Sequence, residues 1–308
     1  MFSFGSSHTR AVLQALLVTF LWSTSWVLIK VGLQGDLPPL TFAGLRYTMA
    51  FMILLPLLLR RPEQLTSVRQ LTARAWLGLI ILGFLYYTLN QGAQFFGLAL
   101  LPSATVNLLL SFSAVVVTLL GSWLLAEQPT PLQWLGVALY VGGVMIYFYP
   151  VTLPTEQITG LLIVLVGVFS NAGAALLGRR INREQHLQPL VVTTISMGIG
   201  AVLLLAAGIL TQGLPNLTLV QWGIIAWLAL VNTAFAFTLW NHTLRTLSAM
   251  ESSIINNAML IQIPLLAWLF LGETFDSKEM FAFLLAGIGI LVVQLKHLPA
   301  SIRRVRHR

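Results

Sequence analysis

The side chains that could do chemistry in this chain are mostly uncharged amides, hydroxyls and aromatic rings, and they are set inside long apolar runs. Tyr87, Asn90, Gln91 and Gln94 have the three- and four-residue spacing that places side chains near one face of a helix. A polar face of this kind avoids lipid, because its hydrogen-bonding groups would stay unsatisfied there. It therefore points to the interior of a helix bundle or to a wet cavity.

We predict that such residues form a central cavity, in which aromatic walls and amides orient a small solute. The predicted substrate-binding residues are Trp22, Thr24, Arg46, Tyr86, Tyr87, Asn90, Gln94, Asn107, Asn171, Asn232, Trp240 and Asn256. For each single residue the alternative is a contact that joins two helices, worth about 0.6 kcal/mol on average. The set favours a cavity, because the polar groups recur on equivalent helices of the two halves described below.

Arg46 is the most informative charge. It lies about six residues into a predicted helix, or roughly 9 Å deep at ~1.5 Å per residue. An arginine at that depth needs an anionic or carbonyl partner. Two alternatives stay open: Arg46 reaches the interface or pairs with Asp36 across a short loop, or Arg46 and Lys30 attract the carboxylate of a substrate.

The chain offers no catalytic constellation. Its nine Asp and Glu residues sit in predicted loops or at helix ends, and it has no cysteine. The absence of cysteine removes thiolate catalysis and thiolate metal sites. We therefore predict no enzymatic activity, no metal and no cofactor.

Three residues are predicted to act as gates or hinges. Glu127 and Glu273 end two predicted helices at opposite sides of the membrane, where they would act as caps or latches. Pro264 interrupts a predicted helix and leaves the carbonyl of Leu260 without its usual donor, so it is either a hinge or a tolerated kink.

The composition is that of a membrane protein. Of 308 residues, 57% are hydrophobic and 8% are charged, against about 25% charged in soluble domains. The segment 75–126 carries no charge, and as one helix it would be ~78 Å long at ~1.5 Å per residue. Because a bilayer core is only ~30 Å thick, this segment must cross twice.

Apolar runs of about 20 residues predict an all-α membrane protein with ten transmembrane helices. Their ranges are 11–32, 40–59, 75–99, 102–125, 131–149, 157–178, 189–212, 220–245, 249–271 and 277–295. Capping boxes at Thr130 with Gln133 and at Asp276 with Glu279 support two of the starts.

The basic residues predict the orientation. With ten spans, only Lys278 falls in an outer loop, while arginine clusters fall on the other side. Such an asymmetry predicts that the protein lies in the cell inner membrane with its N- and C-termini on the cytoplasmic side. The arginines would then lie near anionic lipid headgroups. The +8 net charge therefore requires no nucleic acid.

An internal repeat divides the chain. A shift of 146 positions puts Trp76 on Trp222 and Glu127 on Glu273 without a gap. Five helices per half is an odd number, so the halves 1–150 and 151–308 would be inverted, which suits alternating access. Small residues on the last helix of each half predict packing faces or a homodimer; they are Ala138, Gly142, Ala282 and Ala286.

Several segments carry a resemblance to a known family. They are Phe20–Trp26, Pro39–Arg46, Leu124–Glu127, Leu271–Glu273, and the glycines Gly136, Gly142 and Gly143. In their order and spacing the chain resembles the EamA-type permeases of the drug/metabolite transporter superfamily. The resemblance implies an exporter of small metabolites such as amino acids; export of nucleosides or other xenobiotics, or lipid flipping, remains an alternative.

Overall fold

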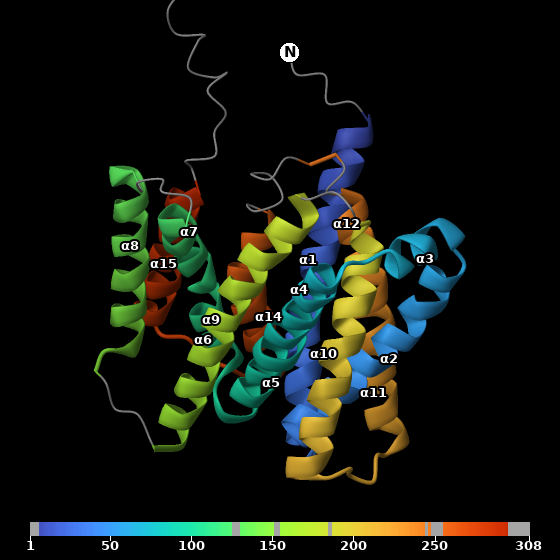
Figure 1. Ribbon diagram of the computed structural model, residues 1–308. Coiled ribbons are helices and arrows are strands. Elements are labelled where there is room, and N and C mark those ends of the chain that lie inside the picture. Colours follow the sequence, from blue (N-terminus) through green and yellow to red (C-terminus); the bar gives the residue numbers. More distant parts are fainter. Residues whose placement is uncertain are drawn as a thin grey trace, which may run out of the picture.

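The computed structural model describes residues 6–124, 130–150, 155–183, 187–243, 246–247 and 255–294. Within these ranges the chain is helical and contains no strand. Most of the helices run side by side in one bundle, with α8 and α15 together at one edge (Figure 1). Glu127, a predicted gate residue at the end of a predicted helix, lies outside the described residues.

Except for α3, which lies in a predicted loop, the helices follow the predicted apolar runs. Those of the first half are α1 (Ser6–Gln34), α2 (Pro39–Leu59), α3 (Pro62–Arg69), α4 (Ala73–Gly83), η1 (Phe84–Asn90), α5 (Gln91–Leu100), α6 (Ser103–Ser111), α7 (Ser113–Leu124) and α8 (Pro131–Phe148). Those of the second half are α9 (Thr155–Arg183), α10 (Pro189–Gln212), α11 (Leu219–Ala229), η2 (Leu230–Phe235), α12 (Ala236–Thr243), α14 (Met259–Leu271) and α15 (Ser277–Gln294).

Six helical segments of the described chain are long and apolar enough to cross a membrane. They are His8–Gln34, Pro39–Leu59, Pro131–Phe148, Gln157–Gly178, Pro189–Gln212 and Leu219–Trp240. A seventh is counted if Pro62–Arg69 and Ala73–Leu100, which meet at a bend of 107°, are one span. The predicted spans 102–125 and 249–271 contain the shorter apolar helices Ser103–Val117 and Ile255–Leu271. The fold is therefore an all-helical membrane protein, and the number ten stays a prediction.

Local capping explains where several helices start. The Thr130 hydroxyl accepts a hydrogen bond from the Gln133 backbone N–H at 3.3 Å, and the Gln133 amide oxygen accepts from the Thr130 N–H at 3.0 Å. The Glu279 N–H donates to the Asp276 carboxylate at 2.7 Å, and the Asp276 N–H donates back to Glu279 at 3.0 Å. Both predicted capping boxes are therefore confirmed, since each satisfies two backbone donors that a helix start leaves open.

Two stretches of π-helix interrupt long helices at related places. The first, η1, begins at Phe84 directly after α4, and the second, η2, begins at Leu230 directly after α11. Their starts are 146 residues apart, which equals the shift that aligns Trp76 with Trp222. A π-helix turns its side chains differently from an α-helix and is often found at functional sites.

Small residues bring pairs of helices close together. At Gly289 of α15, a Cβ atom would lie 2.5 Å from the backbone nitrogen of Tyr140 and 2.7 Å from the carbonyl oxygen of Gly136, both in α8. Ala282 and Ala286 are also fully buried in this contact. The predicted packing face of α15 is thus used within the chain, whereas Ala138 of α8 is exposed and the buried side of α8 holds Gly136, Tyr140 and Gly143 instead.

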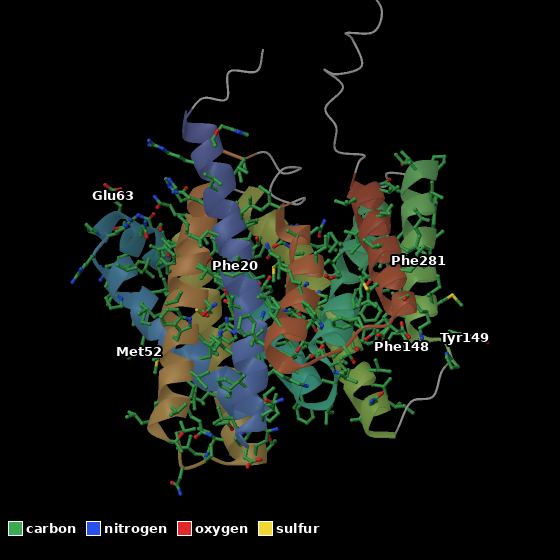
Figure 2. All side chains as sticks on the ribbon, turned by 180° about the vertical axis from the view of Figure 1, so that it is seen from behind. Phe20, Met52, Glu63, Phe148, Tyr149 and Phe281 are labelled. Atoms are coloured by element: carbon green, nitrogen blue, oxygen red, sulfur yellow. The ribbon has the colours of Figure 1, made fainter. Side chains whose placement is uncertain are left out.

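The outside of the bundle is apolar. Phe20, Met52 and Phe281 are 46%, 60% and 56% exposed, and Figure 2 shows them on the outer surface of the bundle on three different helices. Apolar side chains that point outward at mid-height of the helices suit contact with lipid rather than water.

Candidate functional site

The bundle contains a cavity of about 250 Å³. Its walls come from α1, α2, η1, α5, α6, α7, α9, α12 and the helical segment Ile255–Leu271. The lining residues are Trp22, Ser25, Trp26, Arg46, Tyr47, Tyr86, Asn90, Gln91, Gln94, Asn107, Leu110, Ser111, Ser113, Ala114, Asn171, Phe237, Asn256, Asn257, Met259 and Leu260. Amides, hydroxyls and aromatic rings therefore meet at one place, and Arg46 is the one ionised side chain among these residues.

Most of the predicted site residues meet at this cavity. Those that line it are Trp22, Arg46, Tyr86, Asn90, Gln94, Asn107, Asn171 and Asn256. They come from both halves of the chain, so the fold brings together residues that the sequence places up to 234 positions apart, as Trp22 and Asn256 are. Their role in binding a solute stays a prediction.

Four predicted site residues lie behind the wall instead. The Asn232 amide donates to the carbonyl oxygen of Leu21 and, at 3.3 Å, to the Thr24 hydroxyl, so this pair joins η2 to α1. Tyr87 is buried against the rings of Tyr47 and Tyr86. Trp240 packs on Trp22 with ring centroids 5.2 Å apart. These four are absent from the lining and support the residues that form it.

The predicted site did not include twelve of the twenty lining residues, and Tyr47, Ser113 and Phe237 are among those twelve. Phe237 had a usable signal, because the 146-residue shift places it on Gln91, which had been assigned to the polar face. Tyr47 directly follows Arg46, and its hydroxyl donates a hydrogen bond of 2.6 Å to the Gln91 amide oxygen. No pattern in the sequence marks Ser113, which accepts a hydrogen bond from the Asn171 amide at 2.9 Å.

Arg46 is held in the wall by neutral groups. It is 3% exposed, and its Nε donates to the Thr233 hydroxyl at 3.0 Å. The guanidinium carbon lies 5.2 Å from the centre of the Tyr47 ring and 5.9 Å from that of Phe95. In the described part of the chain Arg46 makes no contact with Asp36 or any other carboxylate, so the predicted alternative of an Asp36 pair is not what the fold contains.

Two further polar atoms at the cavity lack a partner within the described residues. They are the indole nitrogen of Trp22 and the amide oxygen of Asn90. Both residues line the cavity, and Asn90 is only 5% exposed. Buried polar atoms are nearly always hydrogen-bonded, so these two unpaired atoms stand out among the residues of the cavity wall.

One end of the bundle holds a charged tie, which we define as Lys30 and Glu273 bound to the turn between α5 and α6. Lys30 Nζ donates to the carbonyl oxygens of Leu98 and Leu101 at 2.6 and 2.7 Å. The Glu273 carboxylate accepts from the backbone N–H groups of Ser103 and Ala104 at 2.7 and 3.3 Å. A cation thus meets the C-terminal carbonyls of α5, and an anion meets the N-terminus of α6, each where the helix dipole favours it.

The tie lies outside the cavity. Lys30 and Leu98 line a second hollow of about 530 Å³, together with Asp36 and the loop that begins α2. Phe42 and Phe95, both fully buried, pack edge to face at 5.1 Å and belong to the same apolar cluster as Leu98. Apolar packing therefore accompanies the tie at this end, which is opposite the N-terminal end of α1 (Figure 1).

The described residues include the predicted hinge Pro264 and the helix end that precedes Glu273. Pro264 lies inside α14 and is buried. Gly272 ends α14 in the left-handed conformation, with φ of 70°, and directly precedes Glu273. A glycine suits this position because it has no Cβ penalty there.

The described residues contain no group of three or more His, Asp or Glu that could hold a metal ion.

Comparison with known proteins identifies the relatives of this fold. The model of the EamA-like transporter family matches residues 9–149 and again residues 158–295. The chain is 26% identical to the uncharacterized transporter YoaV of Bacillus subtilis, over 92% of this chain and 96% of that protein. It is 24% identical to a probable amino-acid metabolite efflux pump of Salmonella typhimurium, over 90% and 92% of the two chains.

A solved crystal structure shares the fold. It matches with a TM-score of 0.66 over 93% of this chain and 98% of its own, at 20% identity. The family matches cover almost all of the chain, and they indicate a transporter rather than an enzyme. The chain is a member of the EamA-like transporter family of membrane proteins.

Proposed function

We propose that this protein exports small metabolites such as amino acids across the inner membrane by alternating access through its central cavity. The observation that carries the proposal is the cavity itself, in which amides and aromatic rings from both halves of the chain surround one arginine. A cavity of this composition binds a small polar solute with an apolar part. The relative named as an amino-acid metabolite efflux pump supports the substrate class and the direction.

Three observations support a repeat of two halves, at 1–150 and 151–308, and the predicted five helices in each half would make this repeat inverted. The family model matches the chain twice, once on each side of residue 150. The π-helices η1 and η2 start 146 residues apart, which is also the separation of Glu127 and Glu273. Inverted halves can exchange conformations, and this exchange moves a central site from one side of the membrane to the other.

The charged tie is proposed to be the gate on the outer side. It joins α1 and the end of α14 to the α5–α6 turn, so it holds together helices from both halves. Release of Glu273 would free the N-terminus of α6, and Pro264 within α14 would act as the hinge. Because Glu127 is the equivalent of Glu273 in the repeat, we propose the same role for Glu127 on the cytoplasmic side. Both termini are proposed to lie on that side as well.

Transport by the purified protein tests the proposal. The protein would be reconstituted in liposomes, and uptake of a labelled panel of amino acids, acylated amino acids, hydroxy acids and nucleosides would be measured. Saturable uptake of at least one solute above that of empty liposomes is expected. Uptake of none, by protein that elutes as one folded species and melts cooperatively, would overturn the proposal.

A further inference from the structure

The cavity carries one positive charge that the described chain does not neutralise. Arg46 has five N–H donors, and the described residues accept from one of them, the Nε that bonds to Thr233. The other charged groups of the described chain are absent from the lining. Lys30, a second cation within a predicted span, is already bound to two carbonyl oxygens.

A lone cation is costly at this depth, because the bilayer core offers neither water nor counter-ions. The rings of Tyr47 and Phe95 near the guanidinium offset part of the cost through cation–π attraction. They do not neutralise the positive charge. A carboxylate does, and an arginine binds it in two parallel hydrogen bonds that are stronger than neutral ones.

The rest of the lining is neutral, and this decides what the solute carries besides a carboxylate. A buried ammonium group is stabilised best by a carboxylate partner, and the lining residues include no Asp or Glu. The free acceptor on Asn90 and the free donor on Trp22 instead suit an uncharged amide or hydroxyl.

We infer that the cavity selects solutes of net charge −1, with one carboxylate on Arg46 and a second polar group that is uncharged. An N-acylated amino acid or a hydroxy acid has this chemistry, whereas a free amino acid is zwitterionic. The inference rests on the proposed transport function and narrows its substrate class from amino acids in general to their anionic derivatives.

A matched set of ligands isolates charge from shape. Alanine, leucine and phenylalanine would each be used in four forms: the free amino acid, the N-acetyl acid, the amino-acid amide and the N-acetyl amide. These forms carry a zwitterion, a net charge of −1, a net charge of +1 and no charge on the same skeleton. Binding would be followed by the change in tryptophan fluorescence, since two of the nine tryptophans, Trp22 and Trp26, line the cavity.

The N-acetyl acid is expected to bind at least tenfold more tightly than the other three forms of the same skeleton. Arg46→Gln should abolish this preference, while Arg46→Lys should keep part of it and Arg60→Gln, at the exposed end of α2, should leave it unchanged. The preference of the unmodified protein is measured first, so the test does not depend on the variants folding.

Two results distinguish failure of the inference from failure of the proposed function. Equal or tighter binding of the free amino acids, or a preference that survives Arg46→Gln, would overturn the anionic selectivity and leave transport intact. No binding of any form, together with no uptake of any solute in the liposome panel, would overturn both.

Discussion

The indole of Trp22 has two separate roles that a single substitution can divide. Its ring packs against Phe237 and Trp240, with centroids 5.3 and 5.2 Å away. Its nitrogen is buried without a hydrogen-bond partner in the described chain. The ring therefore serves packing, and the N–H is left for a ligand.

Trp22→Phe should weaken solute binding and leave stability almost unchanged. The phenyl ring keeps much of the packing, and the variant loses no hydrogen bond of the empty protein. Loss of one bond to the solute costs about 0.5–1.5 kcal/mol, or roughly two- to tenfold in affinity. Fluorescence titration and a thermal melt would check this; a large fall in melting temperature with unchanged affinity would contradict it.

Thr233 positions Arg46. Its hydroxyl accepts from Arg46 Nε at 3.0 Å and donates to the carbonyl oxygen of Leu228 at 2.8 Å, so both sides of the group are used. Thr233→Ala should lower stability by about 1–3 kcal/mol, because a buried charged donor loses its partner. Thr233→Ser keeps the oxygen and should stay close to the unmodified protein in a thermal melt.

Thr238→Ala is the matched control for Thr233→Ala. Thr238 is exposed, and its hydroxyl donates only to the carbonyl oxygen of Ala234, four residues earlier in η2. Its loss should have little effect on stability or binding. Equal effects of the two alanine variants would argue against a positioning role for Thr233.

For single residues, the sequence predicted which residue types form the site better than it predicted where each side chain points. The α-helical spacing placed Tyr87 with Asn90, Gln91 and Gln94, but Tyr86 lines the cavity and Tyr87 packs behind it. Both tyrosines lie in η1, where each turn holds more residues than an α-helical turn. No residue type in Phe84–Asn90 announces a π-helix, so this rotation could not be read from the sequence.

At the scale of elements, the charged tie connects α1, α14 and the turn between α5 and α6. Glu273 is the partner of two N–H groups at the start of α6. The sequence predicted a cap or latch at Glu273 from its place at a helix end. It could not predict that the capped helix belongs to the other half of the chain.

Glu273→Gln should weaken the tie and increase access to the cavity from outside. Removal of the charge from the start of α6 costs about 0.3–2 kcal/mol, which corresponds to roughly a two- to thirtyfold shift between closed and open states. The chain has no cysteine, so Ser25→Cys, at the cavity wall, can report access through its labelling rate by an impermeant maleimide.

Glu279→Gln is the control for Glu273→Gln, because Glu279 caps its own helix α15. It should leave the labelling rate of Ser25→Cys unchanged. A rate that is the same in all three backgrounds would mean that Glu273 does not hold the gate.

The contact between α15 and α8 depends on the absence of a side chain at Gly289. A Cβ atom there would press on the backbone of Tyr140 and Gly136. Gly289→Ala should lower stability by about 1–3 kcal/mol through overpacking. Gly287→Ala, two residues earlier with nothing within 4 Å of the added Cβ, should be neutral or slightly stabilising, because alanine favours helix. A melt in detergent that ranks the two variants equally would contradict this account.

At the scale of the whole molecule, the sequence predicted the class well and the contacts between halves poorly. Apolar run lengths and capping residues such as Thr130 placed the helices, because these signals are local. The Arg46–Thr233 and Ser103–Glu273 bonds join the two halves across 187 and 170 residues of sequence. Such pairs depend on how the helices pack, and the repeat could suggest only which helices are equivalent.

Alternating access through the cavity is the central claim, and counterflow tests it most directly. Liposomes that hold the protein would be loaded with an excess of an unlabelled solute from the panel, and entry of the labelled solute would be followed. The account predicts that the internal solute accelerates labelled entry and raises it to a transient peak, and that Arg46→Gln lowers this peak. Labelled entry at the rate of empty liposomes, or entry that internal solute does not accelerate, would contradict the claim.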